Sequence, residues 1–312
     1  MAGRALCLAL AAVAAVAAGG CGLGAGAEQK GEGVKLSVTR DFGEKQLSGR
    51  RAANVRQDET VMRLLRTSHR VKTRYGGGFV QSIDGLTGTG QGGSRDWFYY
   101  VNGILADKGA SDYTVRPGDA VHWDYRYWKS VPDVKAIVGS FPEPFVNGLD
   151  GRRYPVRVEC QDVSSAPCKR VKATLSKAGV AASGATLGTQ GAQKVARVVV
   201  ADWKTARRLP TLKAIEQGPR RSGVFARYTG GGSRLDLLDD HGRTVRSEGP
   251  DAGLVAALRP TDLQLVWVVT GGDAKGVERA AGAFNGAALR DAFALVAPGG
   301  EAVKVPVPRG AG

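Results

Sequence analysis

Two short aromatic segments constrain the fold of this chain more than any other feature. Residues 96–103 read DWFYYVNG and residues 123–128 read WDYRYW, and together they hold three of the five tryptophans and four of the eight tyrosines. Because successive side chains of a strand face opposite sides, these segments predict strands that build either one concentrated core or a surface for a large flat ligand. The candidate ligand-binding residues are Trp97, Phe98, Tyr99, Tyr100, Asn102, Tyr125 and Trp128.

The first 21 residues are typical of an export signal. Arg4 supplies a positive charge, residues 6–18 are apolar, and small residues precede Cys21. The apolar stretch is shorter than the roughly 20 residues of a membrane span, which favours a signal peptide. A cysteine directly after small residues predicts a bacterial lipoprotein with Cys21 lipidated, and simple cleavage of the signal is the alternative. A flexible tether at residues 22–32 would then hold the protein at the outer face of the cell membrane.

Export also decides how the other cysteines are interpreted. Cys7 lies within the signal, which leaves Cys160 and Cys168 with seven residues between them. Two such cysteines pair in an oxidising compartment, so we predict a disulfide, with two unrelated thiols as the alternative. A zinc site is not expected, because none of the three histidines neighbours this pair.

The chain is strongly basic, with a formal net charge of +15. Its cations are scattered in short doublets such as Arg207-Arg208 and Arg220-Arg221 rather than gathered in one stripe. Since an exported protein does not meet nucleic acid, no nucleic-acid partner is expected. The charge favours solubility and attraction to anionic lipid or an anionic cell wall, although solvated surface charge is the simplest interpretation of any single doublet.

Turn-forming residues divide the chain into two predicted domains. They gather at residues 131–152 and predict a linker there, between a domain at 33–130 and another at 153–312. In the first domain a short helix is expected near residues 60–66, with Asp58, Glu59 and Thr60 as cap candidates, and Asn102-Gly103 favours a turn over a ligand contact. The expected strands are at 34–39, 79–83, 97–101 and 121–127. This pattern predicts a small α+β sheet with one helix on a face.

The second domain is predicted to be α+β as well. Apolar runs indicate buried strands at 195–200 and 263–269, and a hairpin is expected around Gly230-Gly231-Gly232. Helices are expected over residues 204–216, 252–258 and 274–295. Asp239-Asp240-His241 is most simply a hairpin turn, with a metal or catalytic site as the alternative.

Four ordered segments of the first domain carry a family resemblance. They are TVMRLL at 60–65, YGGGFVQSIDGL at 75–86, WFYYVNG at 97–103 and YTVRPGDAVHWDY at 113–125. Together they resemble the DUF4430 family, whose members are similar to the C-terminal domain of transcobalamin and intrinsic factor, over residues 33 to about 130. The resemblance implies a β-grasp-like, transcobalamin C-terminal-type domain. In the cobalamin carriers this domain forms one wall of the corrinoid site and works with a helical barrel, which is not predicted here.

No catalytic group accompanies the aromatic segments. His69, His122 and His241 stand in unrelated contexts, and no Gly-x-Ser-x-Gly pattern occurs. The glycine-rich segments do not carry the lysine and Ser/Thr of a phosphate loop. We therefore expect a binding protein rather than an enzyme, with no cofactor and no metal.

The leading hypothesis from the sequence is a cell-surface lipoprotein whose first domain captures a small molecule. The resemblance suggests a corrinoid such as cobalamin, and an uptake transporter as partner. The alternative is an envelope-associated adhesive or protein-binding module without a small-molecule ligand, which the basic charge would hold near the anionic envelope.

Overall fold

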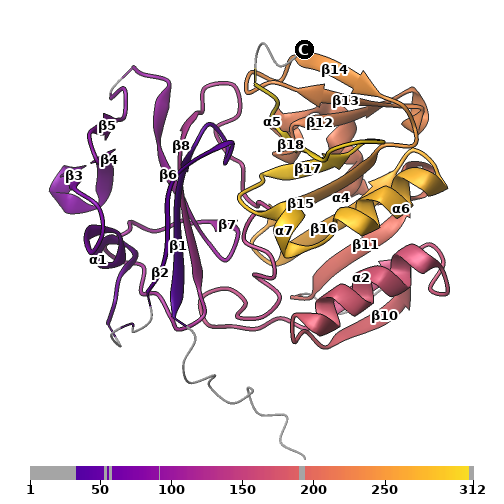
Figure 1. Ribbon diagram of the computed structural model, residues 1–312, viewed down its shortest axis with the longest axis horizontal. Coiled ribbons are helices and arrows are strands. Elements are labelled where there is room, and N and C mark those ends of the chain that lie inside the picture. The colour runs from indigo at the N-terminus through magenta and orange to yellow at the C-terminus, as the bar shows by residue number, and fades with distance from the viewer. Residues whose placement is uncertain (1–32, 53–54, 56–57, 91, 190–193, 309–312) are drawn as a thin grey trace, which may run out of the picture.

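The N-terminal half (residues 33–130) stands beside the C-terminal half (residues 153–308), with its main sheet turned toward it (Figure 1). The computed structural model describes residues 33–308 except 53–54, 56–57, 91 and 190–193. The predicted signal, Cys21 and the tether lie outside the described residues. Within the described part of the chain, no helix is both long enough and apolar enough to cross a membrane.

A five-stranded sheet forms the frame of the N-terminal half. Its order is β2-β1-β8-β6-β7, in which β1 and β8 are parallel and the other neighbours are antiparallel. The two aromatic segments lie on the neighbouring strands β6 and β8, so their alternate side chains face opposite sides of one sheet. The strands are β1 (Val34–Arg40), β2 (Lys45–Ala52), β6 (Arg95–Val101), β7 (Ile104–Leu105) and β8 (Ala120–Tyr127).

One face of this sheet is covered by a helix and a small hairpin sheet (Figure 1). Helix α1 (Val61–Arg66) begins after Thr60, whose side chain accepts a hydrogen bond from the Arg63 backbone N–H at 3.2 Å. This confirms Thr60 among the predicted cap candidates. The hairpin sheet has the order β3-β4-β5, with a short 3₁₀ turn between its first two strands. Its elements are β3 (Val71–Arg74), η1 (Tyr75–Gly77), β4 (Phe79–Ile83) and β5 (Leu86–Thr87).

A seven-stranded mixed sheet runs through the C-terminal half in the order β10-β9-β11-β16-β15-β17-β18. The pairs from β10 to β16 are parallel, and the pairs from β16 to β18 are antiparallel. The inner strands are apolar along their length because both faces of the sheet are covered. The strands are β9 (Val156–Cys160), β10 (Ala182–Thr186), β11 (Ala196–Asp202), β15 (Gly253–Thr261), β16 (Gln264–Gly271), β17 (Ala294–Ala297) and β18 (Val303–Val305).

Helices cover one face of the large sheet, and helices with a second small sheet cover the other. The first face carries α2 (Ala166–Lys177), α6 (Ala274–Ala283) and α7 (Gly286–Leu289). The second face carries α3 (Trp203–Ala206), α4 (Pro210–Lys213), η2 (Ala214–Gln217), α5 (Pro219–Ser222), β12 (Ala226–Thr229), η3 (Gly230–Gly232), β13 (Arg234–Leu238) and β14 (Thr244–Glu248). Helices mixed with several sheets agree with the α+β class that the sequence predicts.

The helices predicted for the C-terminal half need correction. Residues 253–258 of the helix predicted over 252–258 belong to the strand β15, because a short apolar run that is buried on both faces has no periodicity to separate strand from helix. The helix predicted over 274–295 ends at Ala283, and Asn285 caps the separate helix α7. The helix predicted over 204–216 is broken into α3, α4 and η2, with Pro210 beginning the second piece.

The segment 131–152, for which the sequence predicts a linker, packs between the halves. Val131, Val134 and Ile137 are buried, and the Tyr100 hydroxyl donates a hydrogen bond to the Val134 carbonyl at 3.0 Å. The backbone N–H of Ile137 donates to the carbonyl of Gly103 at 2.8 Å. Contacts of this kind hold the two halves against each other.

Candidate ligand-binding cleft

Three of the predicted ligand-binding residues lie in the core beneath α1. Trp97, Tyr99 and Tyr125 are at most 8 % exposed. Each donates its polar hydrogen to a backbone carbonyl, at distances of 3.0, 2.5 and 3.0 Å respectively. Aromatic side chains that are buried with their polar groups paired stabilise the core through packing.

Phe98 and Tyr100 project from β6 to the other face of the sheet, where the C-terminal half covers them. Tyr100 is fully buried, and its ring meets the ring of Phe293 edge to face at 5.6 Å. The guanidinium of Arg126 lies 4.1 Å from the centroid of the Phe98 ring. Protein therefore occupies the face that could otherwise serve as a stacking platform for a flat ligand.

Asn102 and Trp128 complete the set of predicted residues. Asn102 lies in the turn between β6 and β7 with a φ of 53°, and its side chain bonds to Ala120 and Asp119, each at 2.8 Å. The turn predicted at Asn102-Gly103 is thus confirmed. Trp128 is half-buried and donates from Nε1 to Asp96 at 2.9 Å. The seven predicted residues therefore do not form one surface. Three lie in the core on the α1 face, Phe98 and Tyr100 lie on the opposite face, and Asn102 and Trp128 follow the ends of β6 and β8.

A buried polar group lies between the halves on the Phe98 side of the sheet. Thr39 Oγ1 donates to Asp124 at 2.7 Å and lies 2.8 Å from His122 Nε2. Asp124 also accepts the backbone N–H of Phe42 at 3.1 Å, and Asp291 lies 3.8 Å from His122 Nδ1. Burial lowers the pKa of His122 and raises the pKa of Asp124. This group fixes the turn that follows β1.

An open cleft lies at one end of the contact between the halves. Its volume is about 310 Å³, within the range of small-molecule pockets. The turn after β1, the start of β6, the β13–β14 turn and the residues after β18 meet there. The lining residues are Asp41, Phe42, Glu44, Arg95, Asp240, His241, Pro306, Val307 and Pro308.

Arg95 connects the two halves across this cleft. Its Nη1 lies 2.5 Å from Asp41 Oδ1, and its Nη2 lies 3.9 Å from Asp240 Oδ2. On the C-terminal side, the ring of His241 stacks on Tyr127 with a centroid distance of 4.2 Å. The residues that the structure describes include no group of three or more His, Cys, Asp or Glu that could hold a metal ion.

Negative charge exceeds positive charge in the cleft. Among the residues that line the cleft, the carboxylates of Asp41, Glu44 and Asp240 face the single guanidinium of Arg95. Just outside the lining, Arg40 Nε lies 3.4 Å from Asp41 Oδ2, and Arg40 and Lys304 both act to lower the pKa of Glu44. Burial is the main cause that raises the pKa of Glu44, and repulsion from Asp41 adds to it. Burial likewise raises the pKa of Asp240, with repulsion from Asp239 and Asp41 as further causes. A bound cation would relieve this repulsion, so the arrangement suits a positively charged group.

Sequence reasoning does not select the cleft residues. It interprets Asp239-Asp240-His241 as a hairpin turn, which the structure confirms, since Asp239 Oδ1 accepts the backbone N–H groups of His241 and Arg243 at 2.9 Å each. Asp41 and Arg95 belong to no motif. The positive φ of Asp41 at 57° marks an unusual turn, but nothing local shows that segments so far apart in the chain meet.

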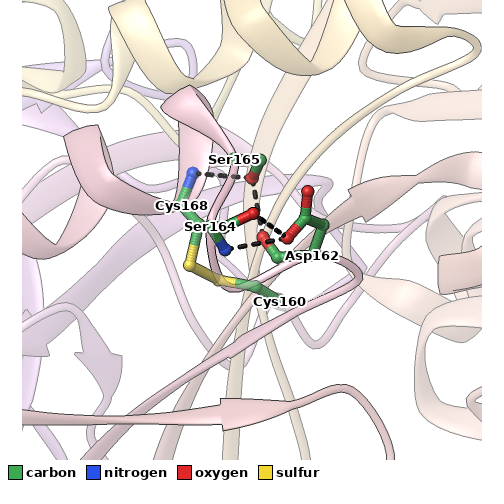
Figure 2. The surroundings of a disulfide bond; sticks show 5 residues. All are labelled: Cys160, Asp162, Ser164, Ser165 and Cys168. Carbon is green, nitrogen blue, oxygen red and sulfur yellow. Dashed lines mark hydrogen bonds between the residues drawn. A yellow bond between two sulfur atoms is a disulfide. The ribbon is translucent and has the colours of Figure 1, made fainter.

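The predicted disulfide between Cys160 and Cys168 is present, outside the cleft. It joins the end of β9 to the first turn of α2, with the two Cα atoms 6.0 Å apart (Figure 2). Ser165 caps the same helix, its hydroxyl accepting the Cys168 backbone N–H at 3.4 Å. Asp162 accepts the backbone N–H of Ser164 at 2.8 Å and orders the connecting turn.

Parts of this chain are similar to known proteins. A crystal structure titled as that of "a putative metal binding protein" from Ruminococcus gnavus ATCC 29149 is similar at 14% sequence identity and a TM-score of 0.25, covering 31% of this chain and 97% of that one. No curated protein matches this chain. Residues 58–127 match the family model described as "Domain of unknown function (DUF4430)". This match, from just before α1 to the end of β8, identifies residues 58–127 as a DUF4430 domain, the family that the sequence indicates.

Proposed function

We propose that this chain is an exported, lipid-anchored binding protein that holds a small organic cation in the cleft between its halves. The cleft is the observation that carries this proposal. Three carboxylates and an apolar wall surround about 310 Å³ at the junction of the halves, and junctions of this kind are common ligand sites. The sequence signal ending at Cys21 supports a position at the outer face of the cell membrane. No catalysis is proposed.

The fold supports a division of labour between the halves. A helix packed on a mixed sheet in which β1 and β8 are parallel supports a β-grasp-like N-terminal half. The C-terminal half then acts as an accessory domain that closes the opposite face of the sheet. It brings Asp240 and His241 opposite Asp41 and Arg95.

The lining favours an amine with a hydrocarbon body. Pro306 and Val307 give the cleft an apolar wall, while the carboxylates stand opposite. Arg95 is already paired with Asp41, so an anionic ligand would have to compete with that carboxylate. Asp41 is likewise paired, with Arg95 and Arg40, so the carboxylates of Glu44 and Asp240 would supply the attraction for a cation.

A corrinoid is the ligand that the family resemblance suggests, and we propose it only as the less favoured ligand. A corrinoid macrocycle is too large to be enclosed in about 310 Å³. The Phe98 and Tyr100 face that could stack on it is covered, so corrinoid capture would require the halves to separate. Whichever solute is bound, we propose delivery to an uptake transporter as the purpose of binding.

Calorimetric titration of the full-length chain in detergent with choline, putrescine, succinate and cobalamin tests the ligand class. We expect saturable binding of an organic cation and no binding of succinate. Asp240→Asn removes one cleft carboxylate and should weaken cation binding about tenfold. Asp107→Asn, an exposed carboxylate outside the cleft, is the matched control. Preference for succinate, or equal loss in both variants, would contradict the proposal, and saturable binding of cobalamin would put the corrinoid first.

A second candidate function is the envelope-associated adhesive module, and one observation favours it. Tyr75 is 78 % exposed, has a φ of 51° and meets the ring of Phe79 edge to face at 6.0 Å. A bulky residue in the left-handed region is strained, and such strain gathers at functional sites. Two exposed rings beside Lys72 and Arg74 suit an anionic wall polymer.

Retention on purified cell-wall material tests this second candidate. Tyr75→Ser combined with Phe79→Ser should abolish retention, and high salt should weaken retention of the unaltered chain. Leu47→Ser removes another exposed apolar side chain, 43 % exposed, and should leave retention unchanged. Full retention of the double variant would reject the adhesive function.

A further inference from the structure

A second cleft, on the C-terminal half, is lined by basic residues. Its volume is about 570 Å³, and it lies among α4, α5, the end of β15 and residues 133–135. Its charged lining residues are Asp133, Lys135, Arg220, Arg221 and Arg259. Arg259 pairs with Asp262 at 3.3 Å, and these two residues line a different cleft. Lys135, Arg220 and Arg221 are thus the cations that face one carboxylate here, the opposite balance to that of the cleft between the halves.

The cations of this basic cleft are poorly neutralised. Among the described residues, Lys135, Arg220 and Arg221 form no ion pair with a carboxylate. These three cations are exposed, and like charges gathered around a concave surface raise its potential and concentrate anions there, an effect that salt weakens.

Backbone contacts hold the walls of the basic cleft in place. Gly223 ends α5 with a φ of 75°, and a Cβ at that position would lie 3.5 Å from the Cα of Val134. Helix α5 therefore approaches the segment that carries Lys135. The Lys135 carbonyl accepts the backbone N–H of Leu105 at 3.1 Å. The cations are carried by ordered backbone, which lowers the entropic cost of binding an anion.

The uncharged residues that line the basic cleft include both polar and apolar side chains. Thr211, Gln217 and Ser222 line the basic cleft together with Leu258 and Pro260. Ser222 is engaged locally, because its hydroxyl donates to the Gly218 carbonyl at 2.9 Å. Thr211 and Gln217 can add neutral hydrogen bonds to a ligand that the guanidinium groups attract.

We propose that the basic cleft binds a small molecule that carries two or more phosphate groups. Guanidinium forks match phosphate oxygens in pairs, and several cations together favour a ligand with several negative charges. The volume of about 570 Å³ lies well within the range of ligand pockets. None of the residues that line the cleft between the halves lines the basic cleft, so this inference does not depend on the proposed function.

Calorimetric titration of the full-length chain in non-ionic detergent with pyrophosphate tests the proposal. We expect saturable binding that weakens as salt is added. Arg220→Ala combined with Arg221→Ala should lower the affinity about a hundredfold, at about tenfold for each lost charge-assisted contact. Lys169→Ala combined with Lys177→Ala removes the same charge from exposed positions on α2 and should change the affinity by about twofold or less.

Two further arms separate the sources of anionic groups. Citrate is a multiply charged anion without phosphate, and sedimentation with phosphatidylglycerol vesicles presents phosphate on a lipid headgroup. Binding to vesicles that the Arg220 and Arg221 double variant loses, without saturable binding of pyrophosphate, would place the phosphate on a lipid headgroup and overturn the small-molecule ligand. Equal affinity for citrate, equal loss in both double variants, or no saturable binding of pyrophosphate or vesicles would overturn the proposal. Lys135→Ala, measured alongside the melting temperature, repeats the test if the arginine variant does not fold.

Discussion

The two faces of the N-terminal sheet are built from alternate residues of the same strands, yet they have different roles. On the α1 face, Trp97, Tyr99 and Trp123 form a dry aromatic core. On the opposite face, Phe98 lies with the buried charges of Asp124 and Arg126 against the C-terminal half. The many aromatic residues of these strands therefore serve two purposes. Some pack within the N-terminal half, and others pack between the halves.

This difference explains why an aromatic segment can suggest a ligand platform. A small sheet with a single short helix needs large side chains to fill its core. The second aromatic layer would be an exposed platform in an isolated domain. In this chain the C-terminal half covers that layer, which leaves the cleft at its edge, near Arg95 and Asp240, as the open part of the junction.

Trp123→Ala should have the largest effect. The side chain is 2 % exposed and its ring lies 4.9 Å from that of Tyr99, so its loss leaves a cavity in the α1-face core. We expect the free energy of unfolding to fall by about 3–5 kcal/mol, measured by urea denaturation with circular dichroism. Phe98→Ala, at a half-buried position on the opposite face, should cost less. Equal costs would remove the distinction between the faces.

The pH dependence of stability tests the junction at Glu143. Burial raises the pKa of this carboxyl to about 7, and its oxygens accept hydrogen bonds from Asn147. The folded protein therefore binds this proton more tightly than the unfolded chain does. The free energy of unfolding should be highest below the unfolded pKa of about 4.5, and should fall by about 3 kcal/mol as the pH rises from there through 7. Denaturant titrations from pH 4 to 8 should show this slope flattened in Glu143→Gln. A slope that persists in the variant would assign it to another group.

Arg126→Met should change stability in the opposite direction to Trp123→Ala. Arg126 is fully buried, and its Nε and Nη2 atoms have no hydrogen-bond partner in the described structure. Burying a charge whose hydrogen-bond donors lack partners costs free energy, so we expect a gain of about 1 kcal/mol. The lost contact with the Phe98 ring and the lost attraction between Arg126 and the buried Asp124 carboxyl reduce this gain. Thermal unfolding followed by circular dichroism measures it. A loss of several kcal/mol would show that the guanidinium is essential to the junction.

Tyr75→Gly should have the smallest effect, outside both faces. Tyr75 is exposed and its φ of 51° favours glycine. Relief of strain, offset by the larger entropy that glycine loses on folding, should raise the free energy of unfolding by about 0.5 kcal/mol. Urea denaturation measures the change, with Leu47→Gly as an exposed control at which no gain is expected. A destabilised Tyr75→Gly variant would indicate that the ring has a packing role, which would weaken the adhesive candidate.

Local elements were predictable where local chemistry decides them. The Thr60 cap, the Asn102-Gly103 turn and the disulfide of Cys160 follow from short-range patterns and from the compartment. The strand β15 was not predictable, because it is buried between β16 and β17 and its apolar run fits a helix equally well. The early end of α6 depends on Asn285, whose capping role is weak in sequence and clear only in the folded chain.

The candidate cleft was beyond sequence reasoning for a different reason. Asp41, Arg95 and Asp240 each lie in an ordinary turn or strand. Only the folded chain brings them together as one charged group that lines a cleft. The Arg220-Arg221 doublet is likewise ordinary surface charge until the fold places Lys135 beside it. The order of charges along a chain does not show which segments lie close together in the fold.

The sequence by itself determined the alternation of the aromatic strands, the covalent link at Cys160 and the family of residues 58–127. These follow from side-chain periodicity and local chemistry, which act over a few residues. Only the tertiary structure decided which aromatic face is covered and where open clefts remain. Which face is covered, and where a cleft remains, depends on how the two halves pack. That packing is set by complementary surfaces whose residues lie far apart in the chain.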